Sequence, residues 1–150
     1  MKAKVLFLCT GNSARSQMAE TFLNTMAPDR FEAFSAGLEP TQINPYTVQV
    51  MDEKKFDISG QQSKGVGIFL GKEFFHFLIT VCDEADKNCP STWPGVNKRM
   101  HWSFEDPAAF EGTDEEKLAK FREIRDQIEE KLSSWLATNP EDELIRVKAK

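Results

Sequence analysis

Short apolar runs alternate along this chain with segments of helical periodicity, and this alternation limits the possible folds more than any other feature. Four runs are typical of strands, the last of them weaker and expected at an edge: residues 5–8, 31–36, 74–81 and 98–102. Three segments have helical spacing or helix-start signals: residues 18–26, about 45–55 and 113–135. This alternation predicts an α/β three-layer sandwich around a central, mostly parallel four-stranded sheet.

The length and charge of the chain narrow its organisation and its partners. A chain of 150 residues fits one domain, which we place at 1–137, followed by a charged and loose C-terminal tail at 138–150. Its 24 acidic and 19 basic residues give a net charge of −5, which disfavours nucleic acid as a partner. No run reaches the roughly 20 apolar residues of a membrane span, and no export signal opens the chain. We expect a cytoplasmic monomer without a membrane partner, with its cysteines reduced.

The residues that carry chemistry begin directly behind the first strand, in the segment CTGNSARS at 9–16. A free thiol has a pKa near ~8.5, and a helix N-terminus or a nearby cation lowers it. The small residues between Cys9 and Arg15 allow backbone N–H groups to turn inward, and a helix begins at the same place. Arg15 adds a planar fork for a tetrahedral oxyanion, and Ser16 can donate a hydrogen bond to the Cys9 sulfur. The segment predicts a thiolate beneath a bound phosphate-like dianion.

The expected oxyanion-binding loop consists of Thr10, Gly11, Asn12, Ser13, Ala14 and Arg15. It differs from the nucleotide-binding loop, because the Gly-Lys-Ser/Thr ending of that motif is missing. A buried structural cysteine beside an unrelated arginine could give the same bare spacing by chance. The strand before the loop, the helix after it and the small residues between them favour the functional interpretation.

Two further cysteines, Cys82 and Cys89, flank the polar segment DEADKN, which we expect to be a loop able to bend. Ligand sites of parallel sheets lie beyond the carboxyl ends of the strands, so Cys9, Cys82 and the segment after Trp102 could meet at one rim. Two buried cysteines that pack as small hydrophobes are the simpler alternative, but the neighbours of Cys89 are polar. A zinc site has poor ligand spacing, because no His lies near the cysteines.

Four segments carry a resemblance to a known family: CTGNSARSQMAE at 9–20, SAG at 35–37, DISGQQS at 57–63 and HWSFEDPA at 101–108. In this order, over about residues 4–137, they resemble low-molecular-weight protein tyrosine phosphatases and the arsenate reductases built on the same fold. The resemblance implies a single phosphatase-like catalytic domain with Cys9 as nucleophile, Arg15 as oxyanion clamp and Asp106 as general acid. Asp-Pro is also a frequent turn opener, so Asp106 could be a turn residue alone.

The segment VCDEADKNCPSTWP at 81–94 resembles the redox segment of thioredoxin-coupled arsenate reductases. The resemblance implies a thiol relay that needs no bound cofactor. Cys9 attacks arsenate, Cys82 attacks Cys9 and releases arsenite, and Cys89 then attacks Cys82. Thioredoxin, as the external reductant, would reduce the resulting Cys82–Cys89 disulfide.

The segment DPAAF places Ala108 and Ala109 where tyrosine phosphatases of this fold usually carry aromatic residues. Small side chains there fit a small oxyanion, with weak phosphatase activity as a side reaction. Two alternatives stay open. One is a tyrosine or small-molecule phosphatase whose extra cysteines protect Cys9 from overoxidation. The other is a non-enzymatic redox sensor that signals through a Cys82–Cys89 disulfide.

Asn12, Glu20 and Ser35 match residues that build a potassium site in some arsenate reductases. The usual acidic fourth position is Lys64 here. Our hypothesis is that the Lys64 ammonium replaces the metal ion and orders Asn12 through Glu20, so that no metal is needed. A solvated loop charge at Lys64 is the alternative.

Overall fold

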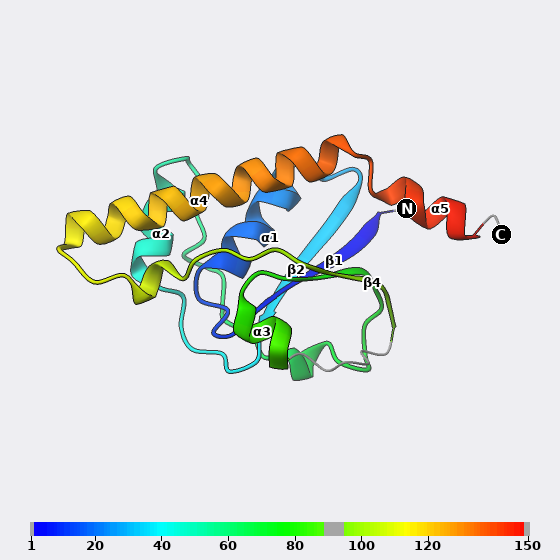
Figure 1. Cartoon of the computed structure of the whole chain (residues 1–150), viewed down its shortest axis with the longest axis horizontal. Coiled ribbons are helices and arrows are strands. Elements are labelled where there is room, and N and C mark those ends of the chain that lie inside the picture. Colours follow the sequence, from blue (N-terminus) through cyan, green and yellow to red (C-terminus); the bar gives the residue numbers. More distant parts are fainter. Residues whose placement is uncertain (1, 89–94, 149–150) are drawn as a thin grey trace.

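The computed structural model describes residues 2–88 and 95–148, and Figure 1 shows their arrangement. Four parallel strands form one sheet in the order β2-β1-β3-β4: β1 (Ala3–Cys9), β2 (Phe31–Gly37), β3 (Phe75–Thr80) and β4 (Val96–His101). The helices are α1 (Arg15–Met26), α2 (Pro45–Asp52), α3 (Asp83–Asn88), α4 (Asp114–Ala137) and α5 (Glu141–Lys148), with short 3₁₀ turns η1 (Val66–Ile68) and η2 (Pro107–Ala109). The predicted α/β fold with a four-stranded sheet is confirmed.

The helices cover the sheet on both sides and so form three layers. The crossover through α1 runs from β1 to β2, whereas the crossover through α3 runs from β3 in the opposite direction to β4. Because parallel crossovers are right-handed, these opposite directions put α1 and α3 on opposite faces. Helix α4 packs on α1 and α2, and Figure 1 shows these three helices on one side of the sheet, with α3 on the other.

The central strands β1 and β3 are buried on both faces, which explains their continuous apolar sequence. Their fully buried side chains are Val5, Leu6, Phe7, Leu8, Phe75, Phe77, Leu78 and Ile79. Strand β4 lies at the edge, as predicted, and its central residues 97–99 are exposed. This exposure accounts for its weaker signal in the sequence.

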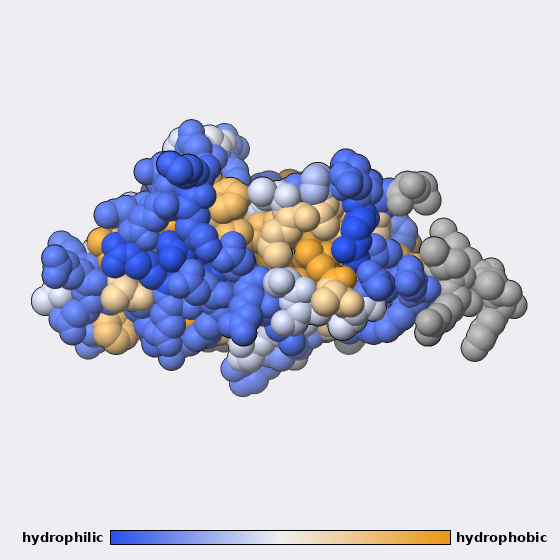
Figure 2. All heavy atoms as spheres, turned by 90° about the horizontal axis from the view of Figure 1, so that it is seen from above, coloured by the Kyte–Doolittle hydropathy of each residue, from blue (hydrophilic) through white to orange (hydrophobic). Residues whose placement is uncertain are grey.

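Helix α4 begins at the predicted capping box. The Thr113 hydroxyl accepts the Glu116 N–H at 3.2 Å, and Glu116 Oε1 accepts the Thr113 N–H at 3.1 Å. The inward face of the helix is apolar except for Arg125. Figure 2 shows that the molecule seen from above is mostly hydrophilic, with a smaller hydrophobic area near its middle. Within the described ranges, no helix combines the length and the apolar composition that crossing a membrane requires.

Residues 83–88 form helix α3 instead of the expected polar loop. The sulfur of Cys82 accepts the Ala85 N–H at 3.4 Å, so the thiol itself takes up one of the free N–H groups at the helix start. Asp83 Oδ1 is held by His101 Nε2 and by the Ser103 hydroxyl, each at 2.9 Å. These contacts come from distant residues, so the local composition could not reveal them.

The C-terminal segment also differs from the loose tail that we expected, because residues 141–148 form helix α5. Acidic side chains occupy the first turn, where they compensate the helix dipole. Glu141 Oε1 accepts a hydrogen bond from Arg30 Nη2 at 2.8 Å, which attaches this helix to the loop before β2. The proposed domain end at residue 137 stays a prediction.

Candidate active site

A pocket of about 500 Å³ opens at the carboxyl end of the sheet. Its lining comes from residues 9–11, 13–15, 82–83, 103–106 and 108, together with Thr41. Strands β1 and β3 are direct neighbours, with Leu8 opposite Thr80, so the segments that follow them lie side by side. The structure therefore brings Cys9 and Cys82 into one pocket, as their positions after predicted strands indicated.

The carbonyl groups of the loop between β1 and α1 accept hydrogen bonds from the segment that follows β2. The carbonyl oxygens of residues 9, 10, 11 and 13 accept backbone N–H groups of residues 38, 39, 41 and 44 at 2.8 to 3.1 Å. Peptide N–H groups on the other side of the loop can then turn toward an anion, and the first turn of α1 points at the same spot. The sequence predicts such an arrangement for an oxyanion site at residues 10–15, and anion binding there stays a prediction.

Gly37 allows this loop to lie against β2. A Cβ atom on Gly37 would stand 2.7 Å from Thr10 O and 2.9 Å from Asn12 N, so any side chain would displace the loop backbone. Gly37 entered the sequence comparison only as part of SAG. Its role was missed because the loop and Gly37 are far apart in the sequence, and their close approach leaves no local signal.

Cys9 is buried, with 3% of its surface exposed, and two donors face its sulfur. The Ser16 hydroxyl lies 2.8 Å from Cys9 Sγ, and the Asn12 N–H donates to the same sulfur at 3.1 Å. Asn12 Nδ2 donates to Ser16 Oγ at 2.8 Å, and the Ser16 hydroxyl proton can then be donated to the Cys9 sulfur when that sulfur is a thiolate. The expected hydrogen bond between Ser16 and Cys9 is present in the structure.

Burial raises the pKa of the Cys9 thiol, whereas the sequence pattern led us to expect a lowered pKa. The Ser16 hydrogen bond, the Arg15 charge and the Asn12 N–H each lower this pKa and offset part of the desolvation. The sequence pattern thus identified the groups that stabilise the thiolate. It could not give the depth at which the sulfur lies.

Arg15 connects the oxyanion loop to the loop that carries Asp106. Arg15 Nη1 donates to Phe104 O at 3.0 Å, and Arg15 Nη2 lies 3.8 Å from Asp106 Oδ2. Asp106 caps η2, where its Oδ1 accepts the Ala108 N–H at 3.0 Å. The carboxyl group is therefore both a turn residue and a member of the pocket.

Cys82 is buried at the start of α3, and its sulfur lies 3.5 Å from Thr10 Oγ1. Both Cys9 and Cys82 are free thiols. Cys89 lies outside the described residues, so its predicted role has no geometry to compare with. In the part of the chain that the structure describes, no three His, Cys, Asp or Glu side chains are grouped as a metal ion would need.

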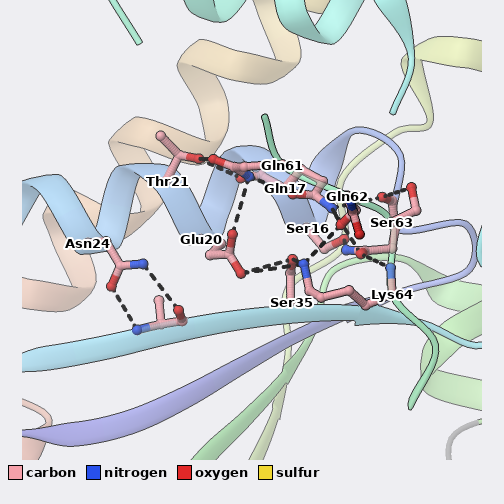
Figure 3. Close-up of polar contacts among 12 residues, drawn as sticks. Ser16, Gln17, Glu20, Thr21, Asn24, Ser35, Gln61, Gln62, Ser63 and Lys64 are labelled. Atoms are coloured by element: carbon pink, nitrogen blue, oxygen red, sulfur yellow. Dashed lines mark hydrogen bonds and ion pairs between the residues drawn. The ribbon is translucent and has the colours of Figure 1, made fainter. Parts of the chain in front are cut away.

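Glu20, Ser35 and Lys64 meet behind the oxyanion loop (Figure 3). Lys64 Nζ lies 3.9 Å from Glu20 Oε1 and 3.5 Å from Ser35 Oγ, and the Ser35 hydroxyl donates to Glu20 Oε1 at 3.2 Å. Burial raises the pKa of Glu20, while Lys64 and Ser35 lower it. We expected the Lys64 ammonium to order Asn12 through Glu20. The direct contact is instead made by the backbone, because the Lys64 N–H donates to Asn12 Oδ1 at 2.8 Å.

Gln17 was not predicted as a site residue, yet it is fully buried and its amide contacts Asn12. In the sequence, Gln17 is a polar residue beside the apolar residues Met18 and Phe22. This position indicates a buried amide only when the inward face of α1 is known.

Comparisons with known proteins agree with this geometry. The family of low molecular weight phosphotyrosine protein phosphatases matches residues 4–146. A curated arsenate reductase from Bacillus licheniformis is 43% identical over 140 residues, which cover 91% of this chain and 97% of the relative. A solved structure of an arsenate reductase in the phosphate binding state shares 34% identity, with a TM-score of 0.75 over 92% of this chain and 98% of the other. An arsenate reductase structure in the oxidized state has the same coverage, 33% identity and a TM-score of 0.76.

Proposed function

Since this chain belongs to the low molecular weight phosphotyrosine protein phosphatase family, we propose that it reduces arsenate to arsenite in the pocket shared by Cys9 and Cys82. The observation that carries the proposal is the second buried thiol in the lining of the oxyanion pocket. Phosphate transfer needs a single nucleophile, whereas a two-electron reduction needs a further thiol to form a disulfide. The arsenate reductases that resemble this chain over most of its length support the same substrate.

In the first step, the Cys9 thiolate attacks the arsenic atom, an S–As bond forms and an As–O bond breaks. Ser16 and the Asn12 N–H stabilise the thiolate before the attack. Arg15 and the N–H groups of residues 10–15 hold the remaining oxygens of the oxyanion. Asp106 gives its proton to the leaving oxygen, which departs as water.

In the second step, the Cys82 thiolate attacks Cys9 Sγ. A disulfide forms while the S–As bond breaks, and the electron pair of that bond stays on arsenic. Arsenic is thereby reduced from As(V) to As(III) and leaves as arsenite. The two thiols have supplied both electrons, so the enzyme is left oxidised as Cys9–Cys82.

In the third step, the Cys89 thiolate attacks Cys82 and releases the Cys9 thiolate. This step rests on the resemblance of residues 81–94, since Cys89 lies outside the described residues. The dithiol of thioredoxin then reduces Cys82–Cys89 and restores both thiols with two electrons. The relay uses no bound cofactor and requires a reducing compartment such as the cytoplasm.

A phosphatase is the second candidate, because the nucleophile, the clamp and the acid are common to both reactions. Ala108 lines the pocket with a methyl group, which suits a small oxyanion better than a tyrosine ring. We propose that hydrolysis of small aryl phosphates persists as a weak side reaction.

Consumption of NADPH in the presence of thioredoxin and thioredoxin reductase tests the proposal. Addition of arsenate should cause repeated turnover, and one arsenite should form for each NADPH consumed. Phosphate-ester hydrolysis without any NADPH consumption on arsenate would support the phosphatase instead. Reversible oxidation of the protein with neither activity would point to the redox sensor.

A further inference from the structure

One buried amide lies behind the nucleophile and is not used by the proposed reaction. Gln17 projects from the first turn of α1 and is 0% exposed. Its Nε2 lies 3.1 Å from Asn12 O, 2.9 Å from Asn12 Oδ1 and 2.9 Å from Gln62 O. Figure 3 shows it at the centre of the polar contacts between α1 and the segment 61–64.

The orientation of the Gln17 amide is set by its surroundings. Three acceptor oxygens face Nε2, and Gln17 Oε1 accepts the Gln61 Nε2–H at 2.7 Å. Gln61 is held in turn by Thr21 and Glu20 on α1, whose contacts with its amide measure 3.0 and 3.2 Å. A flipped Gln17 amide would place its oxygen against three other oxygens, so one orientation is fixed.

The residue that Gln17 holds is the one that contacts the nucleophile. Asn12 has a φ of 51°, a left-handed conformation that costs free energy in a residue other than glycine. This conformation accompanies the hydrogen bond from the Asn12 N–H to Cys9 Sγ. Ser63 Oγ and the Lys64 N–H also donate to Asn12, but of these three residues only Gln17 contacts both the backbone oxygen and the side-chain oxygen of Asn12.

We propose that Gln17 is a positioning residue, which holds Asn12 in its left-handed conformation and thereby directs the Asn12 N–H and, through Ser16, a hydroxyl proton at the Cys9 sulfur. Gln17 acts through Asn12 and touches neither substrate nor sulfur. The inference rests on the proposed function only in taking Cys9 as the nucleophile.

The test compares Gln17→Met with Asn24→Leu. Each substitution replaces a side-chain amide on α1 by an apolar side chain of similar size. Asn24 is exposed, unlike Gln17, but its amide also makes hydrogen bonds to a neighbouring backbone, in this case to Ala33 on β2 at 2.8 and 3.1 Å. Both variants should unfold at a lower temperature than the parent. Only Gln17→Met should change the chemistry of Cys9.

The reactivity of Cys9 is measured in full-length protein in which Cys82 and Cys89 are serine. The pH profile of alkylation by iodoacetamide gives the thiolate fraction without any arsenate. In Gln17→Met we expect the midpoint to move to higher pH and the alkylation rate at neutral pH to fall about tenfold, because fewer Cys9 thiols are then ionised. Hydrolysis of para-nitrophenyl phosphate should show a lower kcat with a smaller change in KM.

Equal alkylation profiles for Gln17→Met and the parent would overturn the proposal, as would an equal shift in Asn24→Leu. Gln61→Met is the milder second variant if Gln17→Met does not fold, because it leaves the Gln17 amide in place and removes only one of its partners, together with the contacts of Gln61 to Thr21 and Glu20. It should shift the profile in the same direction by a smaller amount, and an unshifted profile would contradict the proposal. Failure of the parent to reduce arsenate would refute the proposed function alone, since alkylation does not depend on it.

Discussion

Arg15 Nη2 lies 3.8 Å from Asp106 Oδ2, so the cation that would hold the oxyanion also faces the carboxyl group that would supply its proton. The second nitrogen of the fork, Nη1, is anchored on Phe104 O. A dianion bound at Arg15 would therefore lie next to Asp106. One side chain thus links the expected oxyanion site to the expected acid.

Asp106→Asn should slow arsenate turnover by about 10² to 10⁴-fold, the usual range for the loss of a general acid. The amide keeps the size of the side chain and can still accept the Ala108 N–H, so competitive inhibition by sulfate should stay nearly unchanged. Steady-state kinetics with thioredoxin measure both quantities. A variant with the parent rate would show that another group is the acid.

Arg15→Lys should weaken sulfate inhibition and arsenate affinity about 10 to 100-fold, because the ammonium keeps the charge but loses the fork of charge-assisted hydrogen bonds. Arg122→Lys is the matched control. Arg122 is paired with Glu53 at 2.7 Å on the surface and is not one of the residues that line the pocket. Equal affinities for both variants would exclude Arg15 as the clamp.

Cys89→Ser should release about one equivalent of arsenite per protein and then stop as Cys9–Cys82, since both attacking thiols of the first two steps remain. Cys82→Ser should release none. Rapid-quench measurement of arsenite in a single turnover separates the two variants. Hydrolysis of para-nitrophenyl phosphate should survive in both, because it needs only Cys9, Arg15 and Asp106.

Continued turnover of Cys89→Ser with thioredoxin would refute the three-cysteine relay and indicate that an external thiol resolves Cys9–Cys82. Cys9→Ser is the control for both assays and should abolish reduction and hydrolysis alike.

Ser16→Ala should raise the pKa of Cys9 further. Burial already raises this pKa, and the Ser16 hydrogen bond opposes that rise, so its removal leaves desolvation less compensated. The thiolate fraction at neutral pH falls, and alkylation should recover as the pH increases. Thiolate absorbance during a pH titration measures the shift, and an unchanged or lower midpoint would contradict it.

Lys64 should make the rate independent of potassium, because its ammonium stands beside Glu20 and Ser35. We expect equal rates in potassium and in sodium at equal ionic strength. Lys64→Asp should introduce a dependence on potassium, whereas Lys72→Asp in an exposed turn should not. A severalfold stimulation of the parent by potassium would show that the ammonium does not replace the ion.

Much of the fold followed from the sequence, because strands β1 and β3 are covered on both faces and therefore read as unbroken apolar runs. The capping box at Thr113 was equally visible, since both of its hydrogen bonds join residues three apart. Helix α3 was missed because Asp83 is held by His101 and Ser103, which lie at the end of β4 and just after it, about 20 residues further along the chain.

The candidate site shows the same division between local and distant contacts. The pattern from Cys9 to Ser16 indicated the nucleophile and its donors, because all of them lie on one loop and the first turn of a helix. The raised pKa of Cys9 and the role of Gln17 depend on burial and on the segment 61–64. A single sequence carries no record of either.

Helix α3 has a consequence for the energetics of the redox cycle. Helix α3 occupies residues 83–88 and rises about 1.5 Å per residue, so its first and last Cα atoms are about 7.5 Å apart along the axis, whereas a disulfide requires Cα atoms within about 7 Å. A disulfide between the residues that flank α3, as the proposed relay requires, would therefore need the helix to unwind at least in part. Because reduction lets α3 reform, each 1.4 kcal/mol that α3 contributes should raise the reduction potential of the disulfide by about 30 mV. The stability of one short helix then sets how readily an external dithiol regenerates the protein.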